Sequence, residues 1–122
     1  MFPPIFSICA ADNGVKALLG TSPVRFWPFG SAPQGASMPY GVWQLIGGTP
    51  ENYLGNAPDM DRFSIQVDVY ASTGTVAENT AAVLRDAIEP HAYITAWRGG
   101  DRDLTTKTFR VSFDVDWIKE RA

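Results

Sequence analysis

The chain has 122 residues, of which 45% are apolar and 19% charged, an ordinary composition for a single globular domain spanning residues 1–122. Ten basic and thirteen acidic residues give a formal net charge of −3. Non-specific nucleic-acid binding depends on clustered Lys and Arg that displace counterions, so this balance disfavours a DNA- or RNA-binding role. One cysteine, Cys9, excludes an internal disulfide and favours folding in a reducing cytoplasm.

The distribution of apolar residues argues against two further classes of protein. No apolar run approaches the roughly 18 residues that a membrane-spanning helix needs. The first residues, Met1 to Pro4, lack the basic segment of a secretory signal. We therefore expect a soluble protein made in the cytoplasm, with no membrane partner.

Two short helices are predicted near the N-terminus. Residues 5–19 have a helical pattern that breaks in the middle. Asp12 suits the N-cap of the second helix because its carboxylate can accept a hydrogen bond from a free backbone N–H. Gly20 suits the end of that helix, since glycine adopts the backbone conformation that helix ends often require.

Two strands and two loops are predicted next. A strand over residues 24–29 would lie at a sheet edge, because Pro28 cannot donate a ladder hydrogen bond. A loop over residues 30–38 precedes a strand over residues 39–46. Residues 47–61 are predicted to form a long loop, since they hold three glycines, two prolines and two asparagines. Loops of that length are usually functional or disordered.

The second half of the chain contains two strictly alternating segments, residues 62–71 and 108–117. A period of two predicts half-buried β-strands, with one face on a core. The apolar positions that would face the core are Phe63, Ile65, Val67, Val69, Phe109, Val111, Phe113 and Val115.

A helix is predicted between these strands, ending before Pro90. Hydroxyl side chains at residues 72–75 offer N-caps, and Thr75 with Glu78 matches a capping box. A single apolar stripe with helical spacing would lie on the core. Its members are Val76, Thr80, Val83, Leu84, Ala87 and Ile88.

The remaining strands are expected at residues 91–98 and 105–118, joined by a hairpin loop at residues 99–103. One helical stripe and one apolar sheet face can cover each other most economically in a two-layer α+β sandwich. We expect a mostly antiparallel sheet of about four or five strands with the helices on one face. The opposite, polar face would stay bare in a monomer.

Signals for catalysis or cofactor binding are weak. His91 is the only histidine, and no orienting carboxylate stands near it in sequence. Cys9 lies among apolar residues, which is typical of a buried structural thiol. No phosphate-binding loop, CxxC, HExxH or GxSxG motif occurs. We expect no catalytic residue and no cofactor.

Three acids form the sharpest candidate for a site. Asp114 and Asp116 stand two residues apart on a predicted strand and so project from one face, and Asp68 could face them across the sheet. They could form an acid–base pair or hold a hard cation, but such a cation needs more oxygen ligands. The missing ligands favour solvated carboxylates, or acids that meet an Arg of a neighbouring subunit. We expect no metal site.

Short motifs follow one another along nearly the whole chain. They are Ala17-Leu18-Leu19-Gly20, Val24-Arg25-Phe26-Trp27-Pro28-Phe29-Gly30, Ala32-Pro33-Gln34-Gly35, Met38-Pro39-Tyr40, Trp43-Gln44, Pro50-Glu51-Asn52-Tyr53-Leu54-Gly55, Pro58-Asp59, Gln66-Val67-Asp68-Val69-Tyr70, Leu84-Arg85-Asp86 and Ser112-Phe113-Asp114-Val115-Asp116-Trp117. In this order they resemble the tail completion, or tail terminator, protein family of long-tailed bacteriophages and prophages.

The resemblance implies a small structural α+β subunit and no enzyme. Copies would form a hexameric ring that caps the tail tube, stops its growth and presents a surface for the head. The implied partners are the tail tube protein and head–tail connector proteins, with DNA only as passing cargo. The implied location is the head-proximal end of the virion tail, after assembly in the bacterial cytoplasm.

Two groups of residues are candidate contacts. The first lies in the long predicted loop and is expected to touch a neighbouring subunit or the tail: Glu51, Asn52, Tyr53, Leu54 and Asp59. The second is expected to line the lumen or a subunit contact: Asp68, Asp114 and Asp116. An uncharged or acidic wall would let DNA pass, because basic groups would bind its phosphates.

Three other functions remain open from the sequence. A head–tail joining or stopper protein of the same virion region shares the small size and ring assembly. A small dimeric α+β enzyme could use the acidic sheet face. A monomeric ligand-binding module could be built on Trp27 and Trp43.

Overall fold

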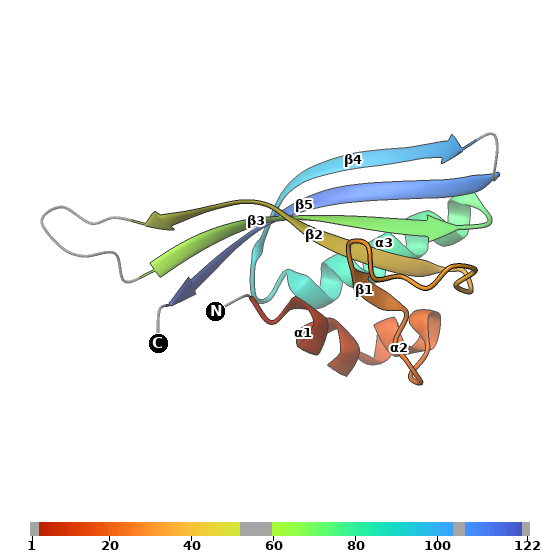
Figure 1. Cartoon of the computed structure of the whole chain (residues 1–122), viewed down its shortest axis with the longest axis horizontal. Helices are drawn as coiled ribbons and strands as arrows, with labels where there is room; N and C mark the ends of the chain where they lie inside the picture. Colours follow the sequence, from red (N-terminus) through yellow and green to blue (C-terminus); the bar gives the residue numbers. More distant parts are fainter. Residues whose placement is uncertain (1–2, 52–59, 104–106, 121–122) are drawn as a thin grey trace, which may run out of the picture.

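The computed structural model describes residues 3–51, 60–103 and 107–120. It consists of one sheet with helices on a single face (Figure 1). The strand order is β1-β2-β3-β5-β4. β1 runs parallel to β2, and all other neighbours are antiparallel. The strands are β1 (Phe26–Pro28), β2 (Tyr40–Glu51), β3 (Met60–Ala71), β4 (Tyr93–Asp103) and β5 (Thr108–Glu120). The predicted α+β class and mostly antiparallel sheet are confirmed.

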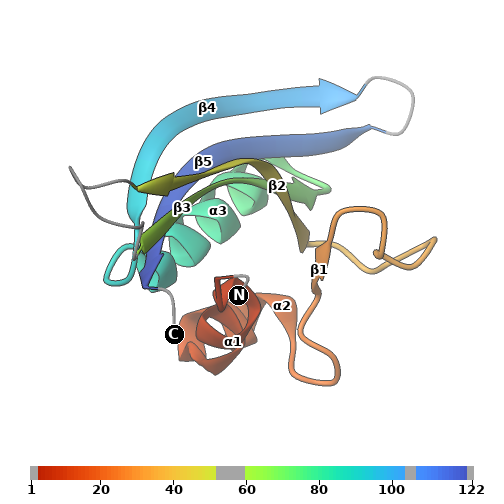
Figure 2. The same cartoon turned by 60° about the vertical axis from the view of Figure 1, so that its left-hand side comes forward.

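All helices of the described ranges lie on the same side of the sheet, which curves around the longest of them (Figure 2). They are α1 (Ile5–Ala11), α2 (Asn13–Leu19) and α3 (Gly74–Ile88). None of these helices has the length and apolar content that a membrane crossing requires. The sheet residues beneath them are almost fully buried, as the alternation predicted: Ile65, Val67, Val69, Val111, Phe113 and Val115.

The two N-terminal helices meet at Asp12, as the sequence predicted. The Asp12 carboxylate accepts a hydrogen bond from the Val15 N–H at 3.0 Å and so caps α2. Gly20 ends α2 with a φ of 82°, a conformation that a residue with a Cβ adopts only at a cost. Both helices pack against α3 and bury apolar side chains in the core, including Ile5, Val15 and Leu19.

The predicted N-cap of α3 among residues 72–75 is confirmed, but the capping box at Thr75 and Glu78 was wrong. Thr73, not Thr75, is the N-cap, and its hydroxyl accepts a hydrogen bond from the Val76 N–H at 3.2 Å. β3 ends at Ala71 and α3 begins at Gly74, so only two residues separate the strand from the helix. The predicted apolar stripe is confirmed: four of its members are buried, and Val76 and Val83 pack against the core partly buried. Ala77 and Ala81 are buried in addition. The buried residues of the helix are thus Ala77, Thr80, Ala81, Leu84, Ala87 and Ile88.

The position of this cap can be tested by substitution. Replacing Thr73 by Ala should lower the free energy of unfolding by about 1 kcal/mol, because the Val76 N–H loses its acceptor. Replacing Thr75 by Ala should change that free energy by less than about 0.5 kcal/mol, as is usual for an exposed residue without such a role. Urea denaturation followed by circular dichroism measures both. An equal loss in the two variants would contradict the assignment.

The predicted loop over residues 47–61 was wrong in its described parts. Residues 47–51 continue β2 and residues 60–61 belong to β3, with Gly47 facing Ser64 and Glu51 facing Met60. A bulge between Leu45 and Gly47 shifts the register but keeps the ladder. Pro50 is tolerated here because β1 pairs with β2 only at Gly41 to Trp43. The ends of β2, β3 and β5 extend beyond the helices (Figure 1).

The predicted hairpin loop at residues 99–103 was also wrong. These residues continue β4, and the register shifts between Trp97 and Gly99. Gly99 has a φ of 71°, so the glycine serves a bulge within the strand and not a turn between strands. Composition alone does not separate these two uses of glycine.

Candidate functional site

The sheet face opposite the helices is the surface left open by the fold. We call it the open face and define it by its polar and aromatic side chains on β2, β3 and β5: Tyr40, Gln44, Ser64, Gln66, Asp68, Tyr70, Arg110, Ser112, Asp114 and Asp116. Residues of neighbouring strands face one another in rows across it. The open face is therefore the candidate functional site.

A row of large side chains crosses one end of the open face. The rings of Tyr40 and Tyr70 stack with centroids 5.1 Å apart, and Trp27 contacts Tyr40 at 5.9 Å. Arg110 follows Tyr70 in the row and donates a hydrogen bond to Asp101 at 3.2 Å. Burial, with a further contribution from the charge of Asp68, raises the pKa of the Tyr70 hydroxyl. The row is thus a neutral aromatic surface bordered by an ion pair.

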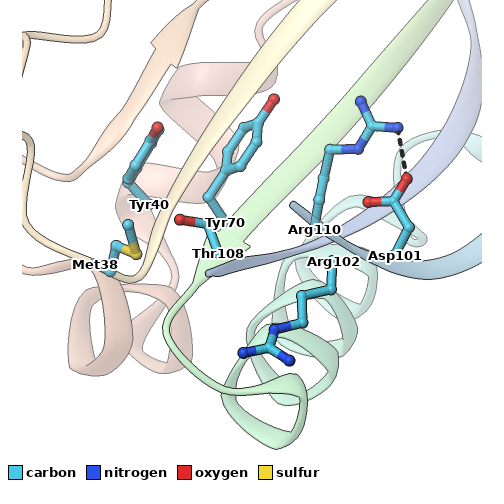
Figure 3. A pocket seen from close by; sticks show the side chains of 7 residues that line it. All are labelled: Met38, Tyr40, Tyr70, Asp101, Arg102, Thr108 and Arg110. Carbon is cyan, nitrogen blue, oxygen red and sulfur yellow. Dashed lines mark hydrogen bonds and ion pairs between the residues drawn. The ribbon is translucent and has the colours of Figure 1, made fainter. Parts of the chain in front are cut away.

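A cavity of about 750 Å³ lies at this row. Figure 3 shows the two tyrosine rings and Arg110 standing on the same side of the sheet. The cavity is lined by Met38, Tyr40, Tyr70, Asp101, Arg102, Thr108 and Arg110. It combines aromatic surface with two guanidinium groups and one carboxylate, which suits contact with a polypeptide surface as well as with a small molecule. Sequence reasoning did not find it, because its residues come from segments far apart in the chain.

Asp68 is buried within the next row, with 4% of its surface exposed. The Ser112 hydroxyl donates a hydrogen bond to one carboxylate oxygen, and the Gln66 amide donates to both oxygens at 3.0 and 3.2 Å. These donors compensate for the loss of water around a buried charge. Asp68 therefore fixes the side chains of Ser112 and Gln66 on the open face through hydrogen bonds.

Removing this buried acceptor should destabilise the fold. The variant Asp68→Ala leaves the Ser112 hydroxyl and the Gln66 amide without their acceptor, and should lower the free energy of unfolding by roughly 1–2 kcal/mol. The variant Asp101→Ala is a control on the same face, since it removes only an exposed ion pair with Arg110 and should cost less than about 1 kcal/mol. Thermal unfolding measures both, and equal losses would contradict the role given to Asp68.

The other two predicted acids lie on the same face and are ion-paired. Asp114, 15% exposed at its side chain, binds Arg98 at 2.6 Å, and its other carboxylate oxygen has no hydrogen-bond partner within the described ranges. Asp116, 23% exposed, accepts a hydrogen bond from Ser64 at 3.0 Å and lies 3.5 Å from Arg62. The structure thus brings the three predicted acids to adjacent strands but gives each one hydrogen-bond donors. In the described part of the chain, no three His, Cys, Asp or Glu side chains form a cluster that could hold a metal ion.

The first predicted contact group lies mostly outside the described residues. Glu51 is the last residue of β2, opposite Met60. Asn52, Tyr53, Leu54 and Asp59 lie outside the described ranges, and their contacts stay a prediction.

Cys9 and His91 occupy ordinary structural positions. Cys9 is fully buried, as predicted, and burial together with the nearby Asp12 carboxylate raises the pKa of its thiol to about 12. His91 is exposed just after α3, and its backbone N–H bonds to the Ile88 carbonyl. Neither residue belongs to the open face.

Large apolar side chains are exposed at the two edges of the sheet, which sequence reasoning missed. On β2, Leu45 and Ile46 are 48% and 47% exposed. On β4, Tyr93 and Trp97 are 66% and 39% exposed. Trp97 stacks on Phe113 with centroids 5.3 Å apart, yet part of its ring stays in solvent. Only the strand order, which the sequence does not reveal, places these residues at edges.

Comparisons with known proteins point to one family. A sequence model of the family described as tail completion protein gp17 matches residues 3–120. A chain of a solved structure titled as the virion of a native gene transfer agent particle has the same fold, with a TM-score of 0.70 and 14% sequence identity over 96% of this chain and 92% of that one. A search of curated proteins found no match. The match over nearly the whole length places this chain in the tail completion protein gp17 family, and its role is a structural one in completing a phage tail.

Proposed function

We propose that copies of this chain assemble into a ring of six that caps the tail tube, ends its growth and prepares it for joining to the head. The observation that carries the proposal is the one-sided covering of the sheet. All helices of the described residues pack on one face, and the other face keeps stacked aromatic rings, ion pairs and a cavity in solvent. A subunit that assembles into a tail can use such an exposed surface to contact other subunits or other tail proteins.

A ring about a single axis needs two different patches on each subunit, since one patch of a copy meets the other patch of its neighbour. The projecting ends of β2 and β3 offer one such patch, at the end of the sheet opposite the aromatic row. In our proposal Glu51, Asn52, Tyr53, Leu54 and Asp59 contact a neighbouring subunit or the tail tube.

The polar rows of the open face offer a second surface. In our proposal Asp114 and Asp116 line the lumen or a subunit contact, and Asp68 holds this face together beneath them. Their pairing with Arg98 and Arg62 gives this face a mixed charge, and basic groups held in ion pairs bind the phosphates of passing DNA less strongly. The role is structural, the partners are the tail tube and head–tail connector proteins, and the site of action is the head-proximal end of the tail.

Shortening the connection between β2 and β3 tests the first group of proposed contacts. Replacing residues 52–59 by Asn-Gly, a sequence that favours a tight hairpin turn, should change the melting temperature by no more than about 2 °C and abolish tail completion. Differential scanning calorimetry and electron microscopy of tails measure the two effects. A shortened chain that still completes tails would remove these residues from the proposed contacts.

Mixing the purified chain with tail tubes tests the ring itself. Native mass spectrometry should detect six copies per assembly, and electron microscopy should place the assembly at one end of each tube. Binding along the tube wall, or no binding to tubes, would contradict the proposal. Binding to head connectors without binding to tubes would indicate a head–tail joining protein instead.

A further inference from the structure

The sheet has two edges whose backbone groups lack a strand partner in the described ranges. β1 pairs with β2 only over Gly41 to Trp43, so the outer edge of β2 from Gln44 to Glu51 is open. β4 is the last strand at the other end of the sheet. Unpaired N–H and C=O groups along a strand are a template for pairing with another chain.

Each open edge includes an uncharged segment with exposed apolar side chains. On β2, no charged residue occurs from Tyr40 to Pro50, and Leu45 and Ile46 are about half exposed. On β4, the charged residues all come after Trp97, so the segment from Tyr93 to Trp97 is uncharged. Edge strands are normally protected against pairing by charges, prolines or bulges. Residues 44–47 and 93–97 contain no charge and no proline, and each of the two segments has one bulge, between Leu45 and Gly47 and between Ile94 and Ala96.

The two uncharged segments lie at the same height in the sheet, meaning that the ladders of the intervening strands connect them in register. Tyr93 faces Asp116, which faces Ser64, which faces Gly47. Ala96 leads in the same way, through Asp114 and Gln66, to Gln44. Rotation about an axis that runs along the strands keeps this height, so it can bring residues 93–96 of one copy beside residues 44–47 of the next. A ring closes only if the contact introduces no shift along its axis.

The strand directions also fit. β2, β3, β5 and β4 alternate in direction, because each of the three pairs between them is antiparallel. The two edges of the four long strands therefore run in opposite directions. A rotated copy keeps its own strand directions, so its β4 lies antiparallel to β2 of its neighbour, which continues the alternation across the contact.

We propose that neighbouring subunits of the ring join their sheets edge to edge, with Gln44–Gly47 of β2 in one copy pairing antiparallel with Tyr93–Ala96 of β4 in the next. This inference rests on the proposed ring and names the contact that builds it. The occupant of each edge is a second copy, because the two edges match in height, direction and lack of charge. Each paired segment contains one bulge, between Ile94 and Ala96 on β4 and between Leu45 and Gly47 on β2, so each spans three rows of the sheet with four residues. The second bulge of β4, after Trp97, and the charges beyond it limit the pairing to the first half of that strand.

Charged substitutions at the two edges test the pairing. Ile46→Lys and Thr95→Lys each place a charge in the contact, and each should weaken ring formation on tail tubes at least tenfold, as measured by native mass spectrometry. The double variant Ile46→Lys/Thr95→Glu puts opposite charges in every contact and should assemble within about fivefold of the unmodified chain. Phe29→Lys is the control, since Phe29 is 68% exposed but lies outside both segments. It should assemble as the unmodified chain does.

Amide hydrogen exchange reads the backbone pairing directly. In the assembled ring, exchange at residues 44–47 and 93–96 should be at least tenfold slower than in the dilute single chain, while exchange at residues 98–103 should stay the same. If the unmodified chain forms rings but neither the lysine variants nor the exchange rates respond, edge pairing is wrong and the ring stands. If edge lysines spare the ring and abolish binding of another virion protein, the edges serve that protein. If no ring forms on tubes, the proposed function and this inference both fail.

Discussion

The variant Phe113→Ala should lower the free energy of unfolding by about 3–5 kcal/mol, the range for removing a large buried aromatic side chain. Phe113 is fully buried near the middle of β5, where it faces Val67 on one side and stacks on Trp97 at 5.3 Å on the other. Removing the ring deletes contacts with both strands at once and leaves a cavity beneath α3. Since domains of this size are stable by only about 5–15 kcal/mol, the variant should be close to unfolding at 37 °C.

Urea denaturation followed by tryptophan fluorescence measures this loss. Phe29→Ala is the matched control, because Phe29 is 68% exposed and its removal should change the free energy of unfolding by no more than about 0.5 kcal/mol. Similar stabilities for the two variants would mean that Phe113 is not at the centre of the core.

The variant Gly41→Val should cost about 3 kcal/mol through steric overlap. A Cβ at Gly41 would lie 2.7 Å from Cδ1 and 3.1 Å from Cε1 of Phe26, and 3.5 Å from Cδ1 of Leu84. Phe26 is fully buried and its ring also contacts Trp43 at 4.7 Å, so it has little room to move. The small residue therefore lets β1 lie against β2 beneath the helices.

Gly47→Val in the same strand is the control. Apart from Gly47 and its two chain neighbours, no described residue has an atom within 4 Å of a Cβ built at Gly47, and valine suits a strand. This variant should be as stable as the unmodified chain when measured at a concentration where the chain is monomeric. A loss as large as that of Gly41→Val would mean that strand glycines matter here for conformational freedom and not for space.

The alternation of apolar residues and the helix caps were predictable because both depend on residues close together in the sequence. The alternation over residues 62–71 and 108–117 identified the central strands and the face that the helices cover. Asp12 and Gly20 marked the helix ends correctly, since caps depend on neighbouring residues alone. The ends of β2 and β4 were not predictable, because backbone ladders across Gly47 and Gly99 depend on the partner strand.

The candidate site was predictable only as a set of positions. Period-two spacing placed Asp68, Asp114 and Asp116 on one face, and the structure has them on adjacent strands. Their surroundings could not be predicted, since the partner of Asp114 is Arg98 on the edge strand β4. The cavity at Tyr40 and Tyr70 and the exposed edges likewise depend on strand order, which contains a parallel β1 and a β5 inserted between β3 and β4.

The most direct test of a tail completion role is the length and attachment of tails made without this chain. In a phage or prophage that encodes it, deletion should give tail tubes of variable, excessive length that carry no heads in electron micrographs. Expression of the unmodified chain should restore one uniform length and attached heads. Tails of uniform length joined to heads in the absence of the chain would contradict the account.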